Sequence, residues 1–341
     1  VQVGPAADAA KVAFDMLTGS NLSDGLLGST WVTATNLLIS WDLPAPPEYL
    51  DLKGRMFVMA ESRWEPFFDE EAQVDWRHVS WGGVFIDDRP LGDTERCGGR
   101  GCIPALDDPK LVPAADGDWY PDDRIVFGVT EGDEAVAFPK NIMQIHEMVN
   151  ITIGGRRFGI PYCTLCGSAQ AFYTDQVPDG VTTPAMRTSG LLNRSNKVMY
   201  DLYSQSAFDT FTGAAVSGPL LVAGVVLDQN SVSVTTWGEW KREHPDTTIV
   251  AEDGGIGRNY PDDPLDGRDD NGPIFPIGPA DDRLGVQELV VGVITGDGTP
   301  VAFPADDARA ALASGDDVEA SGVELVADGG GLRAVDAATG D

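Results

Sequence analysis

The sequence predicts a mainly β protein with short helices, an α+β fold in which duplicated β-hairpin units pack as a sandwich or an open barrel. Two observations favour this class. Forty glycines and 23 prolines indicate many turns and short strands rather than long helices. Two segments far apart in the chain also share one pattern of apolar run, turn and apolar run. A chain of 341 residues has room for two domains, or for one large β-rich domain with additions.

Residues 1–95 are expected to form an N-terminal accessory region. Residues 5–18 are rich in alanine, begin with a proline and precede Gly19, which is typical of a short helix. Residues 20–50 are rich in Ser, Thr and Leu and contain a cluster of prolines near their end. Residues 54–90 mix aromatic with charged side chains, which predicts a packed layer. Within them, residues 79–88 resemble a strand with a glycine bulge.

Residues 96–285 are expected to form the first β-unit. Residues 124–130 and 135–139 are apolar runs around a turn, which predicts a β-hairpin. Residues 141–149 predict one or two helical turns. Residues 150–160 form a second predicted hairpin around a Gly-Gly turn.

Two later features complete this unit. A short helix is predicted to start at Thr235 or Thr236 and to stop before Pro245. Residues 253–285 are rich in Asp, Gly and Pro and are long for a loop in a compact domain, which favours a lid, an insertion or a mobile segment.

Residues 286–341 are expected to form a second, related β-unit. Residues 288–304 repeat the pattern of residues 124–139, and residues 322–336 resemble the second hairpin at 149–160. The second copy lacks the cysteines and histidine of the first. This difference favours a site grafted onto one copy over a cluster that the fold requires.

The charge of the chain excludes some partners. A net charge of −31 repels nucleic-acid phosphates and anionic membrane surfaces, and no apolar run is long enough for a transmembrane helix. Two interpretations fit the dense acidic residues: a protein from a high-salt environment, or one whose Asp-rich loops bind cations. The acidic run at 260–272 lacks the EF-hand spacing, which favours a solvated loop over a calcium site. The first five residues do not resemble a signal peptide, so they indicate either a processed mature end or a cloning boundary.

The four cysteines form two close pairs. Cys97 and Cys102 enclose a glycine-dense loop, and we expect a disulfide between them in an oxidising compartment. The alternatives are free thiols, or half of a four-cysteine metal site shared with Cys163 and Cys166. Close cysteine pairing favours an extracellular or cell-surface location.

The candidate site is the stretch from His146 to Cys166. Cys163 and Cys166 can bind one ion from a single turn, with His146 as a third ligand, a set that suits copper or zinc. Met199, which favours copper, or Glu147 could complete the shell. Only three strong ligands are evident, whereas a structural zinc site usually has four, so an open or redox-active site is favoured.

Other functions stay open for the same residues. A Cys-x-x-Cys can cycle between dithiol and disulfide, although the β-run after it differs from a thioredoxin-like helix start. The cysteines can also only tighten a turn, with His146 as a satisfied core histidine. His78 and His244 fit packing or helix-end roles. An extracellular assembly subunit, forming a homo-oligomer or binding a protein partner, would fit the uncharged stretch at 26–40. The sequence assigns no reaction or substrate.

Several short motifs occur together from residue 103 onward. They are Ile103–Pro109, His146–Asn150, Tyr162–Ala169, Ser189–Leu192, Val198–Asp201, Thr212–Gly213 with Ser217–Leu220, and Thr236–Trp237 with His244–Thr247. In combination they resemble the domain-of-unknown-function family 3179 of bacteria and archaea. The resemblance covers about residues 100–340, leaves the first 95 residues outside, and implies no particular reaction. Tyr203 stands where the family usually has Trp, and Thr164 where it usually has Pro; neither change removes a ligand.

Overall fold

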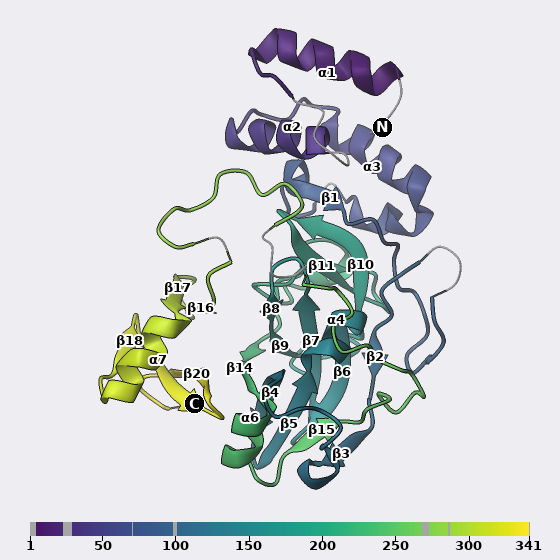
Figure 1. Cartoon of the computed structure of the whole chain (residues 1–341). Helices are drawn as coiled ribbons and strands as arrows, with labels where there is room; N and C mark the ends of the chain where they lie inside the picture. Colours follow the sequence, from purple (N-terminus) through teal and green to yellow (C-terminus); the bar gives the residue numbers. More distant parts are fainter. Residues whose placement is uncertain are drawn as a thin grey trace.

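The computed structural model describes residues 5–22, 29–69, 71–97, 101–267, 273–285 and 287–340. Its strands form several packed sheets that do not close into a barrel, and short helices lie between and beside them (Figure 1). This arrangement confirms the predicted mainly β fold with short helices. None of the helices in these ranges is both long and apolar enough to cross a membrane.

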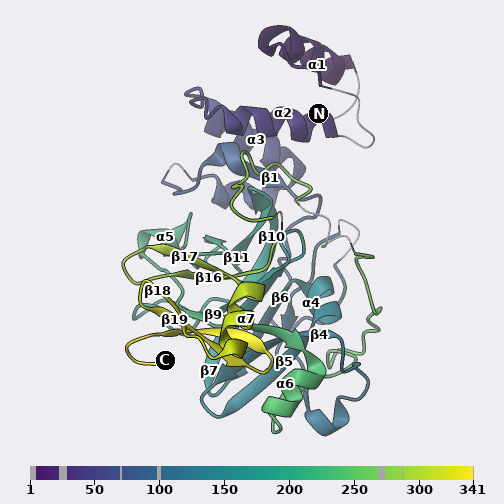
Figure 2. The same ribbon diagram turned by 60° about the vertical axis from the view of Figure 1, so that its left-hand side comes forward.

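Helices form the N-terminal end of the molecule, where they lie above the sheets in Figures 1 and 2. The predicted helix at 5–18 is confirmed, whereas the sequence pattern did not indicate the two helices that follow it. Trp64, Phe67 and Trp76 are buried against Leu191 and Tyr200 of the nearest sheet, so this end shares a core with the strands. The boundary of an accessory region at residue 95 stays a prediction. The elements are α1 (Pro5–Thr18), α2 (Ser29–Ser40), α3 (Tyr49–Ala60), η1 (Ser62–Phe67) and η2 (Trp76–His78).

The first sheet has the strand order β1-β10-β11-β12. The strand expected at 79–88 is shorter than its pattern indicated, because β1 ends at Trp81 and Phe85 makes only an isolated bridge to Cys102. Gly190 of β10 lies close to the chain just after β1. Its φ is +79°, and a Cβ there would lie 2.2 Å from the Val84 carbonyl oxygen. The strands are β1 (Val79–Trp81), β10 (Met186–Asn193), β11 (Asn196–Asp201) and β12 (Ala207–Asp209).

Two further sheets hold the predicted hairpins, which are confirmed. The second sheet has the order β13-β9-β7-β6-β2, with β8 paired to β7, and the third has the order β14-β4-β5-β15-β3. The strands of the second are β2 (Leu106–Asp107), β6 (Met148–Ile153), β7 (Arg156–Cys163), β8 (Ser168–Ala169), β9 (Ala171–Tyr173) and β13 (Gln229–Asn230). The strands of the third are β3 (Leu111–Pro113), β4 (Ile125–Glu131), β5 (Glu134–Pro139), β14 (Ser233–Thr236) and β15 (Thr248–Val250). The short helices η3 (Ala114–Asp116), α4 (Lys140–His146), α5 (Pro219–Val222) and α6 (Trp237–Glu243) lie along this part of the chain, and α6 confirms the predicted helix.

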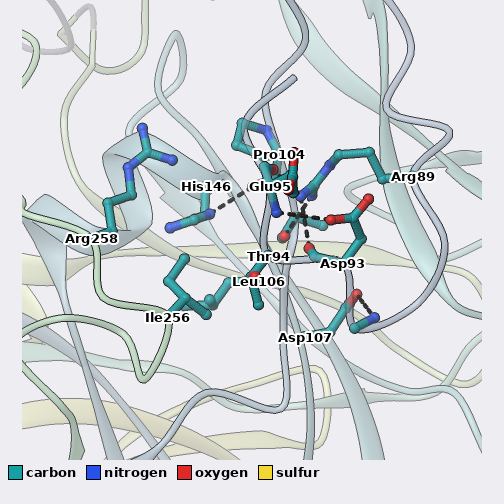
Figure 3. Close-up of a pocket in the computed structure, with 12 residues that line it drawn as sticks. Arg89, Asp93, Thr94, Glu95, Pro104, Leu106, Asp107, His146, Ile256 and Arg258 are labelled. Atoms are coloured by element: carbon teal, nitrogen blue, oxygen red, sulfur yellow. Dashed lines mark hydrogen bonds between the residues drawn. The ribbon is translucent and has the colours of Figure 1, made fainter. Parts of the chain in front are cut away.

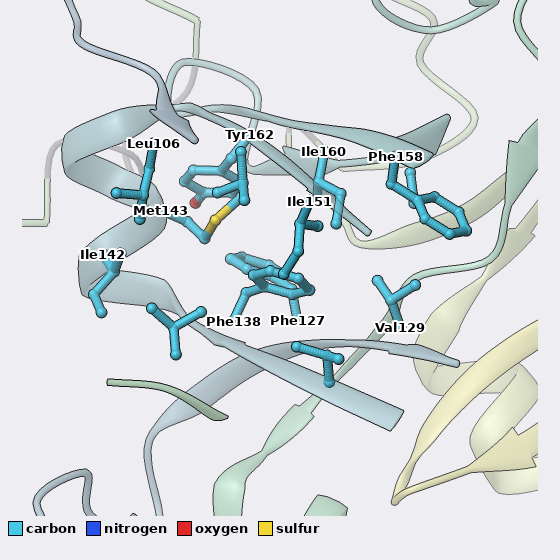
Figure 4. Close-up of a cluster of buried hydrophobic side chains, with 14 of the residues drawn as sticks. Leu106, Phe127, Val129, Phe138, Ile142, Met143, Ile151, Phe158, Ile160 and Tyr162 are labelled. Carbon is cyan, nitrogen blue, oxygen red and sulfur yellow. The ribbon is translucent and has the colours of Figure 1, made fainter. Parts of the chain in front are cut away.

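The main core lies between the two hairpins, β4–β5 and β6–β7. Alternate side chains of β6 point to it, because successive residues of a strand face opposite sides of the sheet. Figure 4 shows Phe127 and Phe138 of one hairpin facing Ile151 and Ile160 of the other. The opposite face of β6 carries Met148, which packs in a separate core with the first sheet. The strand β6, which pairs with the strand that ends at Cys163, is therefore buried on both faces.

The C-terminal segment has its own small core. Phe303, Ala308, Leu325 and Leu332 are buried within it. Figure 2 shows it beside α6, and His244 Nε2 lies 2.8 Å from Asp328 Oδ1 across the contact. Its elements follow the same order as β4, β5, α4, β6 and β7, except for one added strand; whether the two segments are a repeat stays a prediction. They are β16 (Val290–Ile294), β17 (Pro300–Pro304), α7 (Ala305–Ser314), β18 (Val318–Ala320), β19 (Val323–Asp328) and β20 (Gly331–Asp336).

The predicted long loop at 253–285 contains no helix or strand in its described part. The acidic run within it lies partly outside the described residues, which exclude 268–272.

Candidate dithiol site

Cys163 and Cys166 lie side by side as free thiols. Cys163 ends β7, and a tight turn in which the Cys166 N–H donates to the Cys163 carbonyl brings the chain back as β8. The two sulfurs are 3.3 Å apart. Cys163 is 2% exposed, whereas Cys166 is partly exposed. Cys166 is therefore the more accessible residue of the pair.

A strained turn from the neighbouring sheet covers this pair. The β10–β11 connection places Arg194 (φ +48°) and Ser195 (φ +68°) in the left-handed region, where glycine or asparagine is usual. The Ser195 carbonyl oxygen lies 3.5 Å from Cys166 Sγ, and Asn196 Oδ1 also lies 3.5 Å from it. Two buried polar atoms here, Ser195 Oγ and Asn196 Nδ2, have no hydrogen-bond partner. Strain and unpaired polar atoms of this kind concentrate at functional sites.

A buried ion pair lies next to the cysteines. Lys197 is 2% exposed; its Nζ lies 3.0 Å from Glu147 Oε2 and donates to the Glu147 carbonyl at 2.8 Å and to Thr188 Oγ1 at 3.0 Å. Thr164, between the two cysteines, donates from Oγ1 to Glu147 Oε1 at 2.6 Å. Glu147 holds this position in a left-handed conformation (φ +52°) at the end of α4. The carboxylate is thus fixed by Thr164 from within the dithiol turn and by Lys197 from the neighbouring sheet.

The two thiols differ in pKa, chiefly because of the hydrogen bond between them. This hydrogen bond lowers the pKa of Cys163; burial and the negative charge of Glu147 oppose the shift, while the backbone N–H and the charge of Lys197 lower the pKa further. The hydrogen bond to Cys163, followed by burial, raises the pKa of Cys166. The buried sulfur therefore carries the negative charge more readily than the exposed one.

The structure does not bring His146 to the cysteines as a ligand. Its Nδ1 lies 2.6 Å from the Pro104 carbonyl, which can only accept, so Nδ1 carries the proton. Its Nε2 accepts from the Tyr260 hydroxyl at 2.7 Å. Both ring nitrogens are occupied, and burial lowers the pKa of His146 to about 4. Figure 3 shows the ring beside Pro104 and Ile256, in a pocket that contains neither cysteine. A shared ligand set of His146, Cys163 and Cys166 therefore stays a prediction, which the two hydrogen bonds on the His146 ring do not favour.

Met199 is also not presented as a ligand. It is fully buried in an apolar core with Met148, Met186 and Phe208. A thioether surrounded by apolar side chains fills space in the core.

Cys97 and Cys102 form the expected disulfide. Together with Asp87 they offer ligand atoms within 4.8 Å of one another, and among the described residues no other group of three His, Cys, Asp or Glu side chains does so. Asp87 already accepts from Arg89 Nε at 2.7 Å and from the Ala105 N–H at 2.8 Å. Because metals bind thiolates, this group could hold an ion only after reduction of the disulfide. The chain therefore has one closed and one open cysteine pair.

His78 and His244 have structural partners. His78 receives a hydrogen bond from Arg194 Nε at 3.3 Å, and His244 pairs with Asp328. Sequence reasoning missed Lys197 and the turn at 194–195. A lysine near the start of a strand, one residue after a two-residue turn and followed by Val198, Met199 and Tyr200, was the signal that could have indicated them.

A comparison with protein families matches residues 100–340 to a family described as "Protein of unknown function (DUF3179)". No curated protein and no solved structure matches the chain. The match covers more than half of the chain, including both cysteine pairs except Cys97, and it confirms the resemblance noted in the sequence. The chain belongs to the DUF3179 family of proteins of unknown function.

Proposed function

We propose that the protein is a dithiol oxidant that accepts two electrons at Cys163 and Cys166. The observation that carries this proposal is the pair of free sulfurs 3.3 Å apart, one partly exposed and the other buried beside Lys197. A disulfide between them closes with a small movement of either side chain. The exposed sulfur suits attack from outside, and the buried sulfur suits departure as a thiolate.

The exchange begins with the Cys163–Cys166 disulfide. A substrate thiolate attacks Cys166 Sγ, a mixed disulfide forms, and the electron pair of the broken bond leaves on Cys163 Sγ. A second substrate thiol then loses its proton and attacks the substrate sulfur, which releases Cys166 as a thiolate that takes up a proton. The protein disulfide gains two electrons and becomes a dithiol, while the substrate dithiol becomes a disulfide.

Lys197 supports this step through its charge, whereas Glu147 supports it only through position, because its own negative charge raises the pKa of Cys163. When Cys163 departs, Cys166 has no proton to donate, so the Lys197 N–H and ammonium are the groups that stabilise the new thiolate. The Glu147 carboxylate holds the ammonium in place, and Thr164 links that carboxylate to the cysteine turn. Both are positioning residues.

The proposal is tested by trapping the mixed disulfide. The protein is oxidised, mixed with reduced glutathione, quenched with acid and mapped by mass spectrometry. We expect an internal Cys163–Cys166 disulfide before mixing and glutathione on Cys166 afterwards, because Cys166 has the exposed sulfur. The Cys97–Cys102 disulfide is an internal control that stays closed.

Two results contradict the proposal: an internal disulfide that never forms, or glutathione on Cys163 instead of Cys166. The variant Cys163→Ser is the matched control. It keeps the exposed thiol but cannot form the internal disulfide, so reduced glutathione should leave it unmodified.

A second candidate function is binding of Cu⁺ by the two sulfurs. Two adjacent thiols with no third strong ligand favour this soft ion over Zn²⁺, which usually takes four ligands. Anaerobic titration with Cu⁺ against a competing chelator tests it. One equivalent bound by the native protein and lost in Cys166→Ser supports the site, whereas equal binding by both contradicts it.

We also propose an extracellular location in a high-salt environment. A formed disulfide supports the location, and the net charge of −31 supports the environment.

We further propose contact with another protein through the N-terminal helices. Met16, Leu17 and Met59 are more than 80% exposed on α1 and α3, which supports a contact there. Light scattering of the native protein and of Met59→Lys would test self-association: a mass of one chain in both contradicts a homo-oligomer.

A further inference from the structure

A cavity on the third sheet's side of the molecule is independent of the dithiol. It has a volume of about 360 Å³, within the range of small-molecule sites. Aromatic side chains line it, together with Asn141 from the start of α4 and Arg258 from the long loop. The lining aromatic residues are Trp119, Tyr120 and Tyr260.

Two residues that line this cavity each carry a buried polar atom without a hydrogen-bond partner. Asn141 is 3% exposed; its Nδ2 donates to the Pro261 carbonyl at 3.1 Å, but its Oδ1 receives nothing. The indole Nε1 of Trp119 is also buried without an acceptor. A buried polar group without a partner destabilises the fold, so each is expected to have a partner in the functional state. One unpaired atom is an acceptor and the other is a donor.

Arg258 adds a positive charge without a counterion. Within the described part of the chain no carboxylate forms an ion pair with it, although the chain holds 54 Asp and Glu. Its guanidinium contacts the Tyr260 ring at 5.7 Å. Burial lowers the pKa of Arg258; Tyr260 opposes this shift, and Arg96 and Arg89 add to it. Glu252, Asp253 and Asp262 line the cavity without pairing with Arg258, and Asp262 pairs with Arg124 instead. An anion bound beside Arg258 would supply the missing counterion.

We propose that this cavity binds a sugar acid, a small ring that carries a carboxylate and several hydroxyls. Arg258 and the Trp119 N–H bind the carboxylate, and Asn141 Oδ1 accepts from a hydroxyl. The aromatic walls pack against the ring. Glu252 and Asp253, which also line the cavity and are exposed, accept from further hydroxyls.

Calorimetric titration of the full chain with D-glucuronate tests the proposal, with D-glucose and acetate as partial ligands. Glucose lacks the carboxylate and acetate lacks the hydroxyls, so we expect each to bind at least tenfold more weakly than glucuronate. We expect Arg258→Gln to weaken glucuronate binding at least tenfold while glucose binding stays the same. Arg283→Gln changes an exposed arginine paired with Asp281 and should leave binding unaltered.

Three results overturn the proposal: no glucuronate binding by the native protein, tighter binding of glucose than of glucuronate, or an Arg258→Gln variant that binds glucuronate as well as the native protein. Arg258 is partly exposed, so this variant is expected to fold, and circular dichroism checks it. Cys163→Ser should bind glucuronate normally, which separates this site from the dithiol.

Discussion

The segment from β4 to β7 and the segment from β16 to β20 have the same order of hairpin, helix and hairpin. They differ in the residue that follows the helix. The residue that follows helix α7 is Gly315, with φ +83°, the usual residue for this left-handed position. The residue that follows helix α4 is Glu147, with φ +52°, where a side chain costs roughly 1–2 kcal/mol. Glu147 uses the position to reach Lys197 and Thr164. The comparison teaches that the first segment accepts backbone strain in order to hold a charge next to the dithiol.

The largest effect is expected from breaking this ion pair. Lys197→Met leaves the Glu147 carboxylate buried without a cation, so we expect the free energy of unfolding to fall by about 3–5 kcal/mol. Urea unfolding measures it. The matched change in the second segment is Arg309→Met, because Arg309 pairs with the exposed Asp306 at 3.0 Å. We expect it to cost below about 1 kcal/mol.

Equal costs for the two variants would contradict the difference between the segments. The double variant Lys197→Met with Glu147→Gln is expected to regain part of the loss, because it removes the unpaired charge as well.

The next effect sharpens the role of His146 as a structural residue of the first segment. Its pKa is about 4 in the folded protein and about 6.5 when unfolded, so the unfolded chain binds more protons between these pH values. Stability from the neutral ring is therefore complete above about pH 6.5 and is lost as the pH falls towards 4. The loss approaches about 3 kcal/mol at most.

His146→Asn removes this titration, and acid unfolding of both proteins measures it. We expect the stability advantage of the native protein over the variant to shrink as the pH falls from 6.5 to 4. A constant difference over that window would mean that the ring is not buried in the neutral form.

A smaller effect tests how tightly each segment is packed. A Cβ on Gly128 of β4 would lie 2.2 Å from the Trp240 ring, whereas a Cβ on Gly292 of β16 would meet nothing within 4 Å. Gly128→Ala should therefore lose about 1–3 kcal/mol by overpacking. Gly292→Ala should be neutral or gain up to about 1 kcal/mol, because it restricts only the unfolded chain. Thermal unfolding compares them, and equal shifts in Tm would contradict the packing described for the two segments.

The local sequence pattern predicted the hairpins, because apolar runs and turn residues determine the structure of only a few neighbouring positions. It also singled out the stretch that contains Cys163 and Cys166, and the disulfide at Cys97. The sequence patterns could not predict contacts between residues that are far apart in the chain. His146 is held by Tyr260, which is 114 residues away, and Lys197 reaches Glu147 across 50 residues. Spacing placed His146 near the cysteines in sequence, but α4 directs its ring into another pocket.

Our central claim is that Cys163 and Cys166 form a reversible two-electron centre and that the fold does not require a disulfide between them. A redox titration in glutathione buffers, with alkylation and mass measurement of each cysteine, tests it most directly. We expect both thiols to lose and regain their label together along one two-electron curve, with Cys97–Cys102 closed and the circular dichroism spectrum unchanged throughout. Thiols that stay fully labelled in the most oxidising buffer, or a spectrum that collapses as they oxidise, would contradict the claim.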